Sequence, residues 1–332
     1  MHPYPWQAAS AQRLLGLRKQ LPHAILLHGR IGLGKFDLAE AFVKLLLCEN
    51  RTETITQACG TCPSCHWLEL GHHPDLHLLQ PGRMEEVEDA GTERKKSEWI
   101  SVEQVRVAID FLHLSAHRAG LRIVLIRPAE ALNPAAANAL LKTLEEPSEH
   151  ALLILVSHQP SRLLPTILSR CHQLKMELPE TRSAMVWLTE QGVRDAALCL
   201  GLAGGSPLLA TTLAHEEYQA RRRLLLTDLS TGKLAPVLAM AERYAKSMVE
   251  EFSQLLQWLQ QWAYDLQTVL AADRIYYHQD FKEQLHSLAE RVNLNRLQQW
   301  QQRLQQARKV VAHPLNIQME MEDILLEYAA MF

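Results

Sequence analysis

The chain has 332 residues and a net charge of −3, from 34 Lys and Arg against 37 Asp and Glu residues. This length predicts two or three domains at roughly 150 residues each. The charge balance excludes a strongly basic nucleic-acid coat and an acidic disordered tail. Because no apolar run reaches the ~18 residues of a membrane span and no secretory signal pattern opens the chain, we expect a soluble cytoplasmic protein without a membrane partner.

Apolar spacing predicts alternating helices and strands in the first half of the chain. A helical pattern at 7–20 precedes a short apolar strand at 24–28, and a helix follows residue 35. Further strands are expected at 73–81, 122–128 and 151–157, with helices at about 101–114 and 136–146. The charged stretch 82–98 is expected to be a solvated loop. Strands that alternate with helices predict a parallel sheet covered on both faces.

Four of the six cysteines lie within 18 residues, in the spacing Cys48-x10-Cys59-x2-Cys62-x2-Cys65. Two-residue spacers let consecutive thiolates surround one small ion, and Zn²⁺ takes four such ligands tetrahedrally. Because sulfur fills all four positions, the predicted site is structural rather than catalytic. The alternative is a disulfide cluster, which a reducing cytosol disfavours.

The surroundings of these cysteines add three expectations. Gly60 and Pro63 permit tight loops between the ligands. A nearby histidine could replace one cysteine, and the candidates are His66, His72 and His73. The two remaining cysteines, Cys171 and Cys199, are expected to be small buried apolar residues.

A phosphate-binding loop is indicated by Gly29-Arg30-Ile31-Gly32-Leu33-Gly34-Lys35, which follows the first strand and opens a helix. Glycines in such a loop bring backbone N–H groups close to phosphates, and the lysine supplies positive charge. The next residue should be Ser or Thr, whose hydroxyl binds Mg²⁺, but here it is Phe36. A phenyl ring cannot ligate a metal ion.

The partner motif of this loop is an apolar strand that ends in an acidic residue handling Mg²⁺. The matching strand at 123–126 is followed by Arg127 and Pro128, and Glu130 stands two residues too late. Because hydrolysis needs the ion to neutralise charge on the γ-phosphoryl group, we predict a nucleotide-hydrolase fold without hydrolase activity. The loop then either binds nucleotide weakly without Mg²⁺, through Gly29, Gly32, Gly34 and Lys35, or only packs.

After residue 178 the strands stop and helical patterns follow. Residues 179–215 are expected to form short helices, and residues 216–332 long Gln-rich helices. Two apolar stripes at helical spacing predict the core of the second part: Phe252, Leu255, Leu256, Leu259, Trp262, Leu266, Val269 and Leu270, and then Ile317, Met321, Ile324, Leu325 and Tyr328. The chain is therefore expected to combine an α/β domain with two all-α parts.

Two further segments are AAANALLKTLEEP at 135–147 and PTILSRC at 165–171. They resemble the AAA+ clamp-loader subunits of bacterial DNA polymerase III, which place a ring-shaped sliding clamp on DNA, and a phosphate loop followed by a four-Cys insert is typical of the same family. The resemblance covers most of residues 1–215. It implies an AAA+ P-loop domain at 1–178 with a parallel sheet and a zinc insert at 48–65, a helical lid domain at 179–215 and a helical collar domain for oligomerisation at 216–332.

The resemblance also gives Arg170 a role. In the motor subunits of the family, the arginine of SRC enters the neighbour's ATP site as an arginine finger, and Arg170 matches that position. The alternative is that Arg170 caps a helix end or pairs locally. A lid arginine of the family, in a Gly-Ser-x-Arg pattern, is replaced by Leu208, which is a third departure from an active ATP site.

Taken together, the resemblance implies a non-hydrolysing stator subunit of a clamp loader that lends Arg170 to a neighbouring ATPase subunit. The implied partners are motor subunits of the gamma and tau type, a delta subunit, the sliding clamp and primer-template DNA. The implied cofactor is structural Zn²⁺, and ATP binding stays open. Two alternatives are an active ATPase that uses Asp37 or Glu130 as a Mg²⁺ ligand, and a cysteine module that reads DNA directly.

Overall fold

A computed structural model gives the fold of the chain. It describes residues 4–52, 54–82, 98–114, 120–233, 249–310 and 317–332. The chain divides into two compact units, Met1–Ser183 and Ala184–Phe332. The expected loop at 82–98 falls almost entirely outside the described residues. The boundaries expected at 178 and 215 stay predictions.

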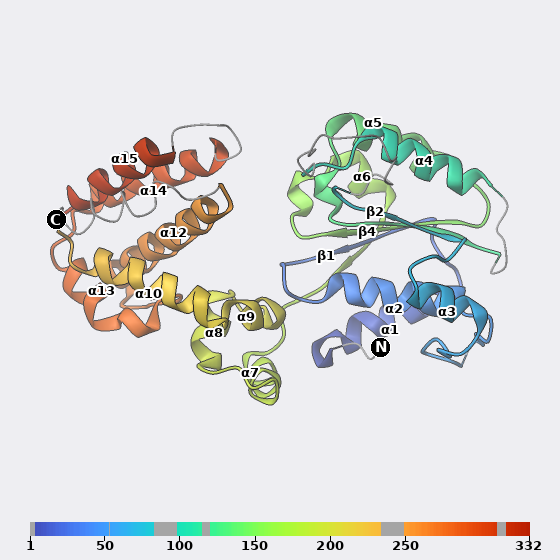
Figure 1. Ribbon diagram of the computed structural model, residues 1–332, viewed down its shortest axis with the longest axis horizontal. Coiled ribbons are helices and arrows are strands. Elements are labelled where there is room, and N and C mark those ends of the chain that lie inside the picture. Colours follow the sequence, from blue (N-terminus) through green and yellow to red (C-terminus); the bar gives the residue numbers. More distant parts are fainter. Residues whose placement is uncertain (1–3, 53, 83–97, 115–119, 234–248, 311–316) are drawn as a thin grey trace, which may run out of the picture. The chain divides into compact units, whose positions relative to one another are not determined.

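The first unit is built on a five-stranded parallel sheet with the strand order β2-β3-β4-β1-β5 (Figure 1). The strands are β1 (Ala24–His28), β2 (Leu76–Leu79), β3 (Arg122–Ile126), β4 (Ala151–Ser157) and β5 (His172–Lys175). The central strand β4 pairs with β1 on one side and with β3 on the other. The parallel sheet predicted from the apolar runs is therefore confirmed.

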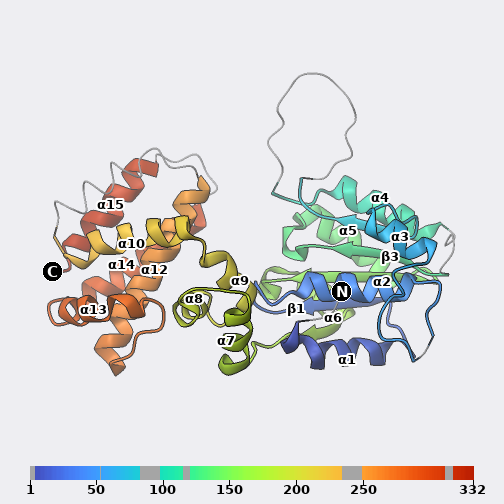
Figure 2. The ribbon, with the colours of Figure 1, turned by 60° about the horizontal axis from the view of Figure 1, so that its bottom comes forward.

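Helices cover both faces of this sheet (Figures 1 and 2). One face carries α4 (Val102–His113), α5 (Pro134–Glu145) and α6 (Pro165–Arg170), and the other carries α1 (Ala8–Leu17), α2 (Lys35–Leu47) and α3 (Pro63–Glu69). Successive strand residues belong to opposite cores: Leu26 lies in the apolar cluster that includes α4 and α5, whereas its neighbour Leu27 lies in the cluster that includes α1 and α2. This alternation is the period of two that a strand imposes. Short 3-10 turns occur at Pro5–Gln7, Ala129–Ala131 and Pro160–Arg162.

The sequence patterns do not predict several short elements of this unit, among them β5 and α3. Strand β5 lies at the sheet edge and buries only Leu174 of its four residues, so it has no apolar run. Helix α3 begins at Pro63, with Cys62 as its N-cap. The expectation of a tight loop at Pro63 is wrong, because Pro63 is the first residue of a helix. Proline suits that position because its ring fixes the backbone angle φ near the helical value.

The described part of the second unit is helical. It comprises α7 (Thr181–Glu190, which begins just before the unit), α8 (Ala196–Leu202), α9 (Pro207–Leu213), α10 (Glu216–Ser230), α12 (Val249–Ala272), α13 (Lys282–Ala289), α14 (Leu294–Val310) and α15 (Ile317–Ala329), with a 3-10 turn at Gln279–Phe281. One apolar cluster belongs to α7, α8 and α9, and a larger one to α10 and α12–α15. Among the described residues, no single helix is long and apolar enough to cross a membrane; the bent pair α8 and α9 meets the test only when its two helices are joined.

The predicted apolar stripes lie in the larger cluster, with one exception. Leu256, Leu259 and Trp262 of α12 are fully buried there, as are Met321 and Tyr328 of α15. Leu270 is instead 41% exposed near the end of α12, so its assignment to the core is wrong. The side chain of Ile317 lies outside the described residues.

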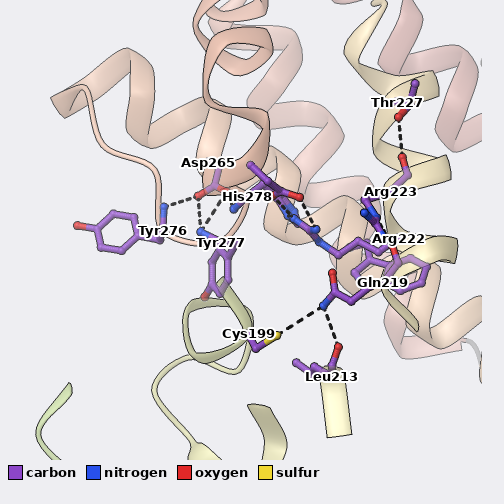
Figure 3. A network of polar contacts seen from close by, with 12 residues as sticks. Cys199, Leu213, Gln219, Arg222, Arg223, Thr227, Asp265, Tyr276, Tyr277 and His278 are labelled. Carbon is purple, nitrogen blue, oxygen red and sulfur yellow. Dashed lines mark hydrogen bonds and ion pairs between the residues drawn. The ribbon is translucent and has the colours of Figure 1, made fainter. Parts of the chain in front are cut away.

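A buried polar network joins α10, α12 and the turn before α13 (Figure 3). The fully buried Arg222 binds both carboxylate oxygens of Asp280 at 2.8 and 2.6 Å, and its Nη2 lies 2.9 Å from His278 Nδ1. Asp265, also fully buried, accepts the backbone N–H groups of residues 276–278, at 2.8 Å from Tyr276 and 2.7 Å from His278. Ionic groups therefore stand inside an otherwise apolar core, and their hydrogen bonds offset the cost of burial.

Candidate functional site

The phosphate-loop segment connects β1 to α2, as predicted. Gly29, Gly32 and Gly34 have φ values of +151°, +79° and +74°, a region that favours glycine. Lys35 is the first residue of α2 and is only 2% exposed. Its Nζ donates to the carbonyl oxygen of Arg30 at 2.5 Å, inside the loop itself. Burial lowers the pKa of Lys35 to about 8, against an opposing contribution from Glu130.

Residues just before α1, which are distant from the phosphate loop in sequence, form hydrogen bonds to it. The buried Gln7 donates to the carbonyl oxygens of Leu33 and Gly34 at 2.8 and 2.7 Å, and Trp6 Nε1 donates to Leu33 at 3.1 Å. A Cβ atom on Gly34 would lie 2.6 Å from atoms of both Gln7 and Tyr4. The segment 4–7 carries no sequence motif that predicts these contacts. Side chains from this N-terminal segment therefore help to fix the shape of the loop.

The two positions that should supply Mg²⁺ ligands contact each other. The guanidinium carbon of Arg127 lies 3.4 Å from the centroid of the Phe36 ring, in a cation–π contact. Arg127 Nε also donates to Gln80 Oε1 at 3.1 Å. A divalent cation at this place would meet a fixed positive charge and a ring without an oxygen ligand. The residues present therefore do not fit a Mg²⁺ ion at either position.

The two acidic residues considered as replacement Mg²⁺ ligands already have protein partners. Glu130 Oε1 accepts the backbone N–H groups of His158 at 2.9 Å and Gln159 at 3.2 Å. Asp37 is hydrogen-bonded to the Tyr4 hydroxyl; burial raises the pKa of Tyr4, and the nearby carboxylate raises it further. Each carboxylate thus has a local role in holding the loop region together.

The four cysteines of the predicted metal site meet in space. The Sγ atoms of Cys48, Cys59, Cys62 and Cys65 all lie within 4.8 Å of one another, and those of Cys59 and Cys65 are 3.9 Å apart. Four thiolates around one Zn²⁺, each at about 2.3 Å, lie about 3.8 Å from one another. The donor set therefore fits a tetrahedral metal ion. All four cysteines are free of disulfides, which opposes the disulfide alternative.

Helix ends and turn N–H groups position these thiols. Cys48 is the C-cap of α2, and the Sγ of Cys62 accepts the Cys65 N–H at 3.4 Å. Hydrogen bonds from Thr61 and from the Cys62 N–H lower the pKa of Cys59 to about 5, whereas burial raises the pKa of Cys65 to about 12. N–H donors aimed at sulfur favour the thiolate that a metal requires.

The histidines near the four cysteines do not join the cluster of sulfur atoms. His73 Nε2 lies 2.6 Å from Ser64 Oγ, and its Nδ1 accepts the Asp75 N–H at 3.0 Å. Both ring nitrogens of His73 are therefore occupied by structural hydrogen bonds. The other two cysteines, Cys171 and Cys199, are buried as expected.

Arg170 lies in the last turn of α6, with its side chain 34% exposed. Its Nη2 is 2.7 Å from Glu145 Oε1 at the end of α5, and its Nη1 donates to the carbonyl oxygen of Thr166 at 3.1 Å. The two segments that carry the family resemblance thus meet in this ion pair. In the isolated chain Arg170 has the local pairing that the sequence left open, and its role as a finger stays a prediction.

Known proteins resemble the chain in both sequence and fold. A family model described as DNA polymerase III, delta subunit, matches residues 13–180. Proteins named DNA polymerase III subunit delta' are 43% identical in Pseudomonas aeruginosa, 37% in Yersinia pestis and 33% in Escherichia coli, over 66%, 69% and 68% of this chain. These matches span 63%, 66% and 65% of the relatives' own lengths.

The fold has a solved counterpart over nearly the whole chain. It is a DNA polymerase III gamma subunit-related protein from Thermotoga maritima, with a TM-score of 0.52 and 17% identity, covering 97% of this chain and 99% of that one. Within the resembling family, the departures at Phe36 and Arg127 together with the SRC segment favour the delta' subunit, which is the name that these relatives carry. Since the family model matches half of the chain, this protein belongs to the DNA polymerase III delta subunit family.

Proposed function

We propose that this chain is a non-hydrolysing subunit of a clamp-loader complex, which helps to load the sliding clamp onto primed DNA. The contact between Arg127 and Phe36 carries the proposal, because it puts a cation and an aromatic ring where a hydrolase places two Mg²⁺ ligands. Without the ion, charge developing on a γ-phosphoryl group has no counter-charge worth several kcal/mol. The chain then acts as a fixed reference against which motor subunits move.

The proposed partners are the motor subunits of the gamma and tau type, the delta subunit, the sliding clamp and primer-template DNA. The names of the relatives and the helical second unit support assembly into such a complex. Any contact with DNA in the assembled complex is expected to involve phosphates and to be independent of sequence. The mass of the chain mixed with its motor and delta subunits, measured natively, tests whether it enters one defined complex.

ATPase measurements on the purified chain test the absence of hydrolysis. We expect no Mg²⁺-dependent turnover above the background of a Lys35→Ala control. The competing interpretation, an ATPase that uses Asp37 or Glu130 as its Mg²⁺ ligand, requires turnover that Mg²⁺ stimulates and Lys35→Ala abolishes. Such turnover by the lone chain would exclude the stator proposal.

Arg170 is proposed to complete the ATP site of a neighbouring motor subunit. The unbroken match of PTILSRC at 165–171 and the partial exposure of the side chain at the end of α6 support this role. In related phosphoryl-transfer systems an arginine finger contributes roughly 10³–10⁵ in rate. In a reconstituted loader, Arg170→Ala should remove the hydrolysis of that one site, whereas Arg182→Ala, an exposed arginine on α7, should not.

The four cysteines are proposed to hold one structural Zn²⁺ ion, on the basis of their mutual distances and N–H donors. A bound ion would tie the end of α2 to the start of α3. The alternative that the module reads DNA is separable by experiment: Cys59→Ser should bind DNA as the unaltered chain does while losing local structure. Loss of DNA binding with the fold intact would favour the reader.

A further inference from the structure

Glu145 is placed where helix stability alone would not favour an acid. It is the last residue of α5, and the negative end of a helix dipole disfavours a carboxylate there. Its carboxylate nevertheless lies 2.7 Å from the Arg170 guanidinium at the end of α6. A cation in the last turn of α6 is favoured by that helix's own dipole. The ion pair with Arg170 therefore offsets the unfavourable position of the Glu145 carboxylate at this end of α5.

Both terminal nitrogens of the Arg170 guanidinium contact groups of its own chain. Nη2 contacts Glu145, while Nη1 donates to the Thr166 carbonyl oxygen and lies 3.5 Å from Ser169 Oγ. To reach a phosphate outside the chain, the side chain has to leave these partners. The pair is open to solvent, with side-chain exposures of 34% for Arg170 and 51% for Glu145, so it is weak enough to be exchanged.

We propose that Glu145 is a positioning residue that holds Arg170 in a retracted conformation until a neighbouring subunit presents a phosphate. The inference rests on the proposed role of Arg170 as a finger. A phosphate group carries more negative charge than one carboxylate and also accepts a bidentate guanidinium. A phosphate close to Arg170 therefore displaces Glu145 from the guanidinium. When no phosphate is close, Glu145 keeps Arg170 retracted.

Steady-state ATPase of a reconstituted loader with Glu145→Gln tests the inference. The glutamine keeps the shape and removes the charge, so less work is needed to extend Arg170. We expect the Arg170-dependent rate, defined as the rate lost in Arg170→Ala, to rise by about two- to fivefold; fivefold corresponds to the ~1 kcal/mol upper range of an exposed ion pair. The change should appear in kcat at saturating ATP, with KM for ATP unaltered.

Two controls separate positioning from a structural effect. Glu146→Gln removes the same charge one residue further along, at the C-cap of α5, and should leave the rate unchanged. The thermal midpoint of Glu145→Gln should stay the same or rise slightly, since the variant removes an acid from a helix C-terminus. A lowered midpoint with a lowered rate would show that Glu145 is structural and overturn the inference.

A double-variant cycle distinguishes this inference from the proposed function. In the Arg170→Ala background, Glu145→Gln should have no effect on the rate. If Arg170→Ala lowers the rate but Glu145→Gln does not raise it, Arg170 is a finger and the positioning role fails alone. If Arg170→Ala leaves the rate unchanged, the finger and its positioning residue both fail.

Discussion

Replacing Lys35 by methionine should stabilise the first unit. Lys35 is 2% exposed as a residue, and its ammonium has the Arg30 carbonyl oxygen as its hydrogen-bond acceptor. Burial lowers its pKa from 10.5 to about 8, so the folded state disfavours the charged form. The penalty is fully present below pH about 8 and disappears as the pH rises toward 10.5, because the unfolded chain then binds more protons than the folded one.

The size of this penalty follows from the two pKa values. Each pH unit between them corresponds to about 1.4 kcal/mol, so the charged form is disfavoured by roughly 3 kcal/mol at neutral pH. Methionine removes this term but also loses one hydrogen bond, worth about 1 kcal/mol net. We expect Lys35→Met to raise the free energy of unfolding by about 1–2 kcal/mol near pH 7, and this gain to fall by roughly 2 kcal/mol by about pH 10.

Urea denaturation followed by circular dichroism measures the effect, and hydrogen exchange in β1 and β4 assigns the transition to the first unit. Lys44→Met is the matched control: Lys44 lies on the same helix but is 29% exposed and pairs with Glu40 at 2.8 Å. Its effect should stay within about 0.5 kcal/mol at both pH values. A destabilised Lys35→Met, or a gain that is equal at both pH values, would refute the argument.

Further predictions concern the second unit and the cysteines. Arg222→Met should lower the free energy of unfolding by about 3 kcal/mol in denaturant titration, because it strips Asp280 of its buried partner; Arg221→Met, an exposed neighbour, should cost less than about 1 kcal/mol. Asp265→Asn should cost about 2–4 kcal/mol in the same titration, since one amide oxygen cannot accept all the N–H groups of residues 276–278; an unchanged midpoint would contradict this. Cys59→Ser should lower the metal content measured by elemental analysis and speed hydrogen exchange in 48–65, while exchange in β4 stays slow; equal metal content would exclude Cys59 as a ligand.

Sequence patterns predict the fold best where burial is continuous. Strand β4 has the predicted bounds of 151–157, because six of its seven residues are buried and apolar runs of that length are distinctive. Apolar spacing does not predict strand β5, because this edge strand buries only Leu174. The apolar stripe of α12 wrongly includes Leu270, because the helical spacing continues to a residue that is 41% exposed. The periodicity of apolar residues indicates which face of a helix or strand is buried. The residues that pack against that face determine how far along the element the burial extends.

The features of the candidate site also differ in how well the sequence predicts them. The four cysteines and the phosphate loop are local in sequence, so spacing alone predicts them. The contact of Arg127 with Phe36 depends on strand order: β1 and β3 both flank β4, which brings the residues after their carboxyl ends to one edge of the sheet. The pair of Glu145 with Arg170 likewise depends on the packing of α5 against α6. The sequence identifies the partners but not their pairing.

Lys35 distinguishes the two interpretations of the phosphate loop, which either binds nucleotide without Mg²⁺ or only packs. Packing explains two of the loop glycines, because a Cβ on Gly29 would lie 2.5 Å from the Met176 carbonyl oxygen and one on Gly34 would lie 2.6 Å from atoms of Tyr4 and Gln7. Packing does not explain a buried ammonium, because an apolar side chain of similar length would serve the same space at lower cost. If the loop only packs, ATP without Mg²⁺ leaves the thermal midpoint of the unaltered chain unchanged. If the loop binds nucleotide, ATP raises that midpoint and Lys35→Met abolishes the rise, so one measurement decides whether the lysine has a ligand to hold.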